Sequence, residues 1–132
     1  KRFTVKTDNA DAALLTLTLA LAFAVFACWY VRDRAAGALS ELRLAQVQAG
    51  RGDFENAADA VLAASQRWHA NERFFDVVLR HDEVDAVSVG FASLQQYAQA
   101  ESRGDFAAAC AELIERVQRI RQMQLPLVSN IL

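Results

Sequence analysis

The chain has few of the residues that interrupt helices and few of those that bind nucleic acid. One proline and five glycines occur in 132 residues, so long stretches can stay helical. Lysine is confined to Lys1 and Lys6, and no basic run occurs, which excludes a surface for binding the phosphate backbone of nucleic acid. The formal net charge is −2, which gives no strong field to steer a charged partner.

Cysteine is equally scarce. Cys28 and Cys110 are the two thiols, and they form neither a CxxC pair nor a zinc-binding spacing. We predict that both are small apolar packing residues and that the protein carries no cofactor.

One long apolar segment runs from Ala12 to Val31, 20 residues without a charge. A helix of that length spans roughly 30 Å, the thickness of the hydrocarbon core of a bilayer. Trp29 and Tyr30 close the segment just before Arg32 and Arg34, which is typical of a membrane interface. The segment therefore predicts a transmembrane helix, with the lipid bilayer as a partner.

Three other interpretations of this segment fit less well. A cleaved signal peptide has an apolar core of about 7–15 residues, which is shorter than this one. A lipoprotein signal would place a small residue two positions before Cys28, where Phe26 stands. A buried helix of a soluble protein would show a polar stripe, and this segment shows none. Charge does not settle the orientation, because the two flanks carry similar numbers of Lys and Arg.

The sequence Arg-Gly-Asp-Phe occurs twice, at 51–54 and 103–106, each time before an alanine-rich stretch. We interpret both copies as joints between helices. Gly52 and Gly104 would take the left-handed conformation that ends a helix. Asp53 and Asp105 would then cap the next helix. This explains both copies without an adhesion motif.

The predicted fold is all-α: an N-terminal transmembrane helix that continues into a small antiparallel bundle of about four helices. The expected regions are a cytoplasmic N-terminus at 1–11, the membrane helix at 12–31 and an extracytoplasmic bundle at 32–132. The expected helices extend to about residue 49, then over 54–69, 72–100 (with Asn71 as its cap) and 106–124, where Pro126 ends the last one. A tetratricopeptide-like repeat is the alternative, but the two copies are 52 residues apart rather than 34.

Apolar residues recur at spacings of three and four, which places one buried stripe on each helix. The predicted stripes are Leu39, Leu42 and Ala45; Phe54, Ala58, Val61, Ser65 and Trp68; Val77, His81, Val84, Ser88, Phe91, Leu94 and Ala98; and Phe106, Cys110, Leu113, Val117 and Ile120.

Several motifs follow one another in order along the second half of the chain. They are Trp68, Asn71, Glu72, Phe74 and Phe75; His81, Glu83, Val84 and Asp85; Gly104 and Asp105; and Leu125, Leu127, Asn130 and Ile131. Their order and spacing resemble the bacterial membrane-associated family known as domain of unknown function 4363. The resemblance covers nearly the whole chain, with phenylalanines where a tryptophan is common. It implies a cytoplasmic N-terminus and an extracytoplasmic bundle, and no reaction. It also points to a partner, a multi-pass membrane protein of the domain of unknown function 421 family.

The stretch RHDEVD at 80–85 is the densest group of polar side chains. On a continuous helix, His81 and Asp85 would face inward one turn apart, while Asp82 and Glu83 would face solvent. The first interpretation is a buried His–Asp hydrogen bond near Trp68. Metal binding would need further ligands, for which His69 is the other histidine. No nucleophile is adjacent for catalysis, and a pH-responsive contact is a further alternative.

The last residues, LPLVSNIL, form an apolar tail that includes Leu127, Asn130 and Ile131. The tail would either fold back onto the bundle or dock on a membrane partner.

Together these features predict a non-enzymatic, single-pass membrane protein that acts as an accessory subunit of an envelope complex. The alternative is an extracytoplasmic module that senses a ligand, a metal or pH through His81 and Asp85.

Overall fold

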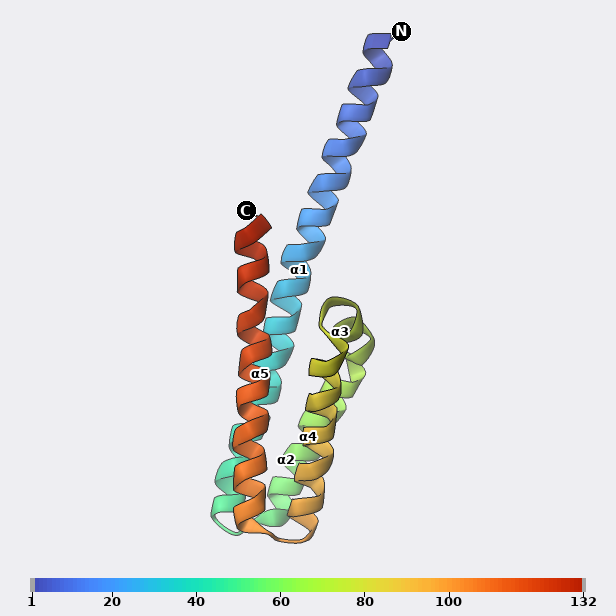
Figure 1. The fold of residues 1–132 in the computed structure, drawn as a ribbon. Coiled ribbons are helices and arrows are strands. Elements are labelled where there is room, and N and C mark those ends of the chain that lie inside the picture. Colours follow the sequence, from blue (N-terminus) through green and yellow to red (C-terminus); the bar gives the residue numbers. More distant parts are fainter. Residues whose placement is uncertain (1, 132) are drawn as a thin grey trace.

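The structure is a computed structural model that describes the backbone of residues 2–131 and the side chains of residues 8–122. Over that range the chain forms five helices and no strand, which confirms the predicted all-α class. The helices are α1 (Arg2–Gly50), α2 (Phe54–Ala70), α3 (Glu72–Val78), α4 (His81–Gln99) and α5 (Arg103–Ile131) (Figure 1).

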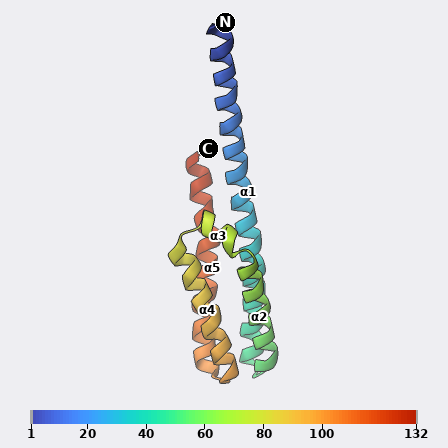
Figure 2. The ribbon, with the colours of Figure 1, turned by 90° about the vertical axis from the view of Figure 1, so that its right-hand side faces the viewer.

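Four of these helices form an antiparallel bundle. The second half of α1 packs against α2 and α5, and α4 packs against the same two helices, so that each helix has two neighbours. The chain runs alternately up and down through α1, α2, α4 and α5, and α3 caps the end of the bundle where α1 leaves it (Figures 1 and 2). The predicted bundle that follows an apolar N-terminal helix is therefore confirmed.

The core is built from the predicted stripes of α1, α2 and α5, and from the predicted residues Val84, Phe91, Leu94 and Ala98 of α4. Aromatic rings fill both ends of the bundle: Trp68 lies 4.4 Å from Phe75 between ring centroids, and Phe54 lies 6.4 Å from Phe106. Fully buried members of the stripes are Leu39, Leu42, Ala45, Val61, Phe106, Cys110, Leu113, Val117 and Ile120. These side chains meet because each stripe follows the helical period and faces the same axis.

The first half of α1 extends away from the bundle (Figure 2). It is long and apolar enough to cross a membrane, and only 11% of its most apolar 18-residue window is buried. The core helix of a soluble protein would be mostly buried. The hydroxyls of Thr16 and Thr18 donate to the carbonyls of Ala12 and Leu14, each at 2.8 Å, so that neither polar group needs a partner outside the helix.

The apolar segment and the bundle overlap by a few residues. Ala27, Cys28 and Val31 belong to the predicted membrane span, and all three are buried in the fold. Residues 8–26 are exposed or only partly covered. The end of the apolar segment is thus also the first layer of the bundle core.

The predicted helix over 72–100 is broken, and that prediction was wrong. Leu79 and Arg80 have extended backbone, with ψ values of 164° and 137°, which separates α3 from α4. A continuous helix would carry Phe75 past the end of α2 and away from Trp68, whereas the break folds α3 back over the core. Val77, predicted to face inward, is 77% exposed for the same reason.

The prediction that Pro126 ends the last helix was also wrong, because α5 continues to Ile131. A proline removes one backbone hydrogen bond, but the φ angle that its ring imposes is a helical one. The backbone of α5 therefore continues past the end of the bundle toward the level of the apolar half of α1 (Figure 1).

Candidate functional site

Five residues form an aromatic corner where α2 meets α3, and they define the end of the bundle nearest the apolar segment. They are Tyr30, Trp68, Asn71, Phe74 and Phe75. Trp68 is only 2% exposed and packs on Phe75 within the corner. The structural or interaction role that the sequence predicts for Trp68 stays a prediction. Its indole Nε1 has no hydrogen-bond partner among the described residues.

Asn71 joins the corner to α1. Its side-chain Nδ2 donates to the carbonyl of Arg67 at 2.8 Å, which satisfies one of the free carbonyls at the end of α2. Its Oδ1 accepts a hydrogen bond from the hydroxyl of Tyr30. Asn71 occupies the N-cap position of α3, as predicted, but its side chain makes no capping hydrogen bond there. The side chain closes the preceding helix instead.

Tyr30 is the residue of α1 that contacts the aromatic corner, through Asn71 and Phe74. Its ring lies 4.7 Å from that of Phe74 in an edge-to-face arrangement, and the Arg34 guanidinium lies 5.0 Å from its ring centroid. The sequence indicates only that Tyr30 ends the apolar segment. No local sequence pattern marks the contact between Tyr30 and Asn71, because the two residues are 41 positions apart.

The predicted inward pair of His81 and Asp85 does not exist. The His81 side chain is 79% exposed, and its Nδ1 lies 3.4 Å from a carboxylate oxygen of Asp76. Asp85 is exposed as well. The cause is the break before α4: His81 is the first residue of that helix, and the buried face of the helix begins one turn later, at Val84.

The candidate metal ligands are likewise apart. His69 lies at the end of α2, where its Nδ1 is 3.1 Å from Glu72. Within residues 8–122 no group of three or more His, Cys, Asp or Glu side chains is arranged to hold a metal ion. His69, His81 and Asp85 therefore do not form one site.

The first Arg-Gly-Asp-Phe joint is built as predicted. Gly52 has a φ of 81°, in the left-handed region. Asp53 caps α2 by accepting from the backbone N–H of Asn56 at 3.3 Å. The joint turns the chain from α1 into α2.

The second joint uses different residues, so the predicted role of Gly104 was wrong. Glu101 takes the left-handed conformation, with a φ of 51°, and Gly104 lies inside α5. Ser102 stands before the helix and its hydroxyl donates to Asp105 at 2.8 Å. Asp105 therefore lies in the first turn of α5 and accepts from the Ser102 hydroxyl instead of capping the helix, because the turn occurs three residues earlier than predicted.

Cys110 lies in the core between α5 and α1. Its Sγ is 3.4 Å from the carbonyl oxygen of Leu42. Burial raises the pKa of the Cys110 thiol from 9.0 to about 11, because the thiolate would lose its hydration. Its role is that of an apolar packing residue with a neutral thiol.

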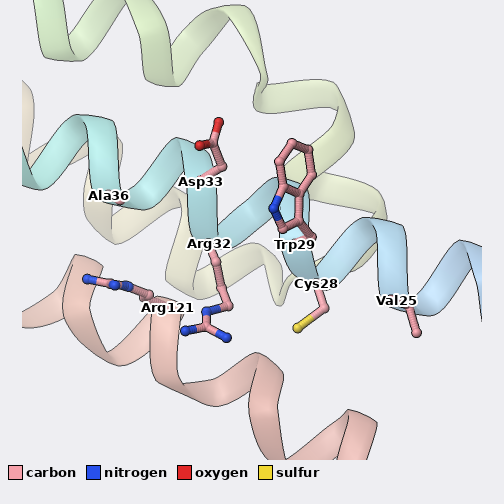
Figure 3. A pocket seen from close by; sticks show the side chains of 7 residues that line it. All are labelled: Val25, Cys28, Trp29, Arg32, Asp33, Ala36 and Arg121. Carbon is pink, nitrogen blue, oxygen red and sulfur yellow. The ribbon is translucent and has the colours of Figure 1, made fainter.

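A groove of about 490 Å³ lies between α1 and α5 at the level where the apolar segment ends. Figure 3 shows Arg32 extending from α1 toward α5, while Arg121 comes from α5. Neither guanidinium has a carboxylate within 4.0 Å among the described side chains. The remaining residues of this groove are Val25, Cys28, Trp29, Asp33 and Ala36.

Comparison with known protein families gives a match over most of the chain. Residues 25–131 match the family described as a domain of unknown function, DUF4363. The chain belongs to the DUF4363 family. No curated protein and no solved structure matches it.

The structure shows what several DUF4363-like positions do. Trp68, Asn71, Phe74 and Phe75 build the aromatic corner, which gives that stretch of the sequence a structural role. His81 and Asp85 lie on the surface. Leu127, Asn130 and Ile131, together with the rest of the apolar tail, have side chains outside the described residues.

Proposed function

We propose that this DUF4363 chain is a bacterial single-pass membrane protein and a non-enzymatic accessory subunit of an envelope complex. Its N-terminus would lie in the cytoplasm and its bundle outside the membrane. One observation carries the proposal: a single helix, α1, is exposed and apolar in its first half and forms part of the bundle core in its second half.

The overlap between the apolar segment and the core supports a retained anchor. Removal of the segment as a signal peptide near Cys28 would remove the buried Ala27 and place the new N-terminus against the core. Val31 and Ala35 are fully buried one and two turns further on, so a new N-terminus at Cys28 would lie within the first layer of the core. Because the end of the apolar segment forms part of the bundle core, we infer that the segment is retained as a membrane anchor and is not cleaved.

Two observations support the accessory role: the exposed apolar surface of α1 and the family resemblance. The exposed apolar half of α1 offers packing area to other membrane helices, including Leu14, Leu17 and Leu19. The resemblance to proteins encoded beside the domain of unknown function 421 family supports a multi-pass membrane partner. A sensor built on His81 and Asp85 is not favoured, because these side chains do not meet.

Anchoring is tested by placing charges in the apolar half of α1. The double variant Leu17→Arg/Leu19→Arg should appear in the soluble or degraded fraction, because each arginine at a span centre costs about 2.5–3.5 kcal/mol on insertion scales. The matched control is Leu44→Arg/Val47→Arg, which changes exposed apolar residues of the same helix within the bundle. The control should stay in the membrane after alkaline carbonate extraction. Equal extraction of both variants would argue against the anchor.

Sidedness and partnership need separate measurements. Protease added to intact spheroplasts should digest the bundle, while the same protease added to sealed inverted vesicles should leave it intact. The full-length chain, solubilised in mild detergent, should co-purify with a multi-pass membrane protein. A monomer that runs alone in several mild detergents would contradict the accessory role without affecting the anchor.

A further inference from the structure

Two arginines from different helices line the groove between α1 and α5. Arg32 is the first charged residue after the apolar segment, and Arg121 reaches the same level from α5. Both side chains are partly buried, so their charges are less well hydrated than those of free surface arginines. Like charges that line one groove favour an anion between them.

The acidic residue of the groove does not fill that role. Asp33 is exposed, and in Figure 3 its carboxylate points to the opposite side of α1 from the Arg32 guanidinium. No ion pair joins it to either arginine among the described side chains. The groove therefore carries two guanidiniums against one carboxylate that is turned away.

The groove is continuous with an apolar surface. A second depression on α1 is lined by Thr18, Leu21, Ala22, Val25, Phe26 and Trp29. Val25 and Trp29 belong to both depressions, so the charged groove opens directly onto the apolar one. From Arg32, the apolar depression leads toward the N-terminus of α1, the direction in which the helix becomes wholly apolar.

From this arrangement we propose that the groove binds a membrane phospholipid with a net negative headgroup. Its phosphate would lie between Arg32 and Arg121, which donate charge-assisted hydrogen bonds. Its acyl chains would lie along Val25 and the apolar face before it, with Trp29 at the level of the headgroup. The order of the two depressions matches the order of the two parts of a phospholipid. The inference rests on the membrane anchor proposed above.

The test uses the full-length chain in nanodiscs with equal amounts of phosphatidylglycerol and phosphatidylcholine, followed by native mass spectrometry of retained lipid. The wild-type protein should retain phosphatidylglycerol in preference. Arg32→Gln/Arg121→Gln should lower that preference about tenfold or more, because two cations near the surface are lost. Arg43→Gln/Arg119→Gln is the matched control, since it removes one exposed arginine from each of the same two helices. The control should behave like the wild type.

Several outcomes would overturn the assignment. One is wild-type protein that retains both lipids equally, and another is the same loss in the control variant. Competition by inorganic phosphate at millimolar concentration, without any lipid preference, would show a site for free anions. If Arg32→Gln/Arg121→Gln fails to fold, Arg121→Gln alone should show a smaller loss, and no loss would count against the site. Carbonate extraction of every variant separates a failed anchor from a failed lipid site.

Discussion

Tyr30 and Asn71 are joined by a hydrogen bond from the tyrosine hydroxyl to the asparagine Oδ1. This bond fastens the corner between α2 and α3 to the point where α1 leaves the bundle. Because the acceptor also belongs to the residue that closes α2, one side chain holds three helices together.

The Tyr30–Asn71 contact should be measurable as a coupling energy. Tyr30→Phe should lower the free energy of unfolding by about 1 kcal/mol, because it removes one partly buried hydrogen bond. A double-mutant cycle with Asn71→Ala, followed by thermal unfolding in detergent, measures the pairwise part. Tyr97→Phe is the control, since the Tyr97 hydroxyl has no partner among the described residues. Purely additive effects of Tyr30→Phe and Asn71→Ala would show that the pair does not interact.

The two tryptophans should differ sharply in their contribution to stability. Trp68→Ala should cost about 3–5 kcal/mol, because it opens a cavity among Phe75 and Phe91. Trp68→Phe should cost less, since it keeps a ring and removes a buried N–H that has no partner. Trp29→Phe should leave bundle unfolding nearly unchanged, because Trp29 is 62% exposed. Similar unfolding midpoints for Trp68→Ala and Trp29→Phe would contradict the burial of Trp68.

His81 should be dispensable for folding. His81→Ala should change the free energy of unfolding by no more than about 0.5 kcal/mol, as is usual for a surface position. Leu94→Ala, on the buried face of the same helix, should cost about 2–5 kcal/mol. Chemical unfolding of both variants gives the comparison. A large loss with His81→Ala would restore the buried pair that the break between α3 and α4 rules out.

The two glycines of the repeated motif should respond in opposite ways to alanine. Gly52→Ala should destabilise the fold by about 1–2 kcal/mol, since an L-residue is strained in the left-handed region. Its Cβ would also lie 2.9 Å from an Arg103 side-chain nitrogen. Gly104→Ala should stabilise by about 0.5 kcal/mol, because the position is helical and has open space. Equal losses in thermal unfolding would mean that both joints are built alike.

Cys110 should make stability depend on pH only in alkaline solution. Its pKa is raised from 9.0 to about 11 in the fold, so the unfolded chain loses this proton first as pH rises. Stability should be unaffected by this group below pH 9 and should fall between about pH 9 and 11. Cys110→Ala should lack that part of the decline. A decline of the same size in the variant would assign it to other groups.

The sequence predicts those parts of the fold that depend on a regular period. The stripe of α5 through Cys110, Leu113 and Val117 is buried as expected, because a single uninterrupted helix keeps its phase. The break at Leu79 and Arg80 has no glycine or proline to mark it, so the predicted inward residues next to it, Val77 and His81, are exposed, while Val84, Phe91, Leu94 and Ala98 further along α4 are buried as predicted. That is why His81 was assigned to the core.

The aromatic corner and the groove between α1 and α5 could not be predicted from the sequence, for a different reason. Tyr30, Arg32 and Arg121 acquire their roles from neighbours on other helices, and no local pattern encodes such a pairing. The first copy of the repeated motif was predicted correctly because glycine and aspartate act within one turn. In the second copy Glu101 takes the strained conformation, and propensity alone would not choose it.

The unbroken path of α1 makes the exposed apolar segment and the bundle one mechanical unit. Its 49 residues form a rod of about 70 Å at 1.5 Å per residue. No residue along it provides a hinge between the exposed half and the half that α2 and α5 enclose. If a partner tilted or rotated the exposed half of α1, the bundle would rotate with it through the same angle, because the two parts share one continuous helix. A small displacement at one end would then become a larger one at the distant joints near Gly52 and Ser102.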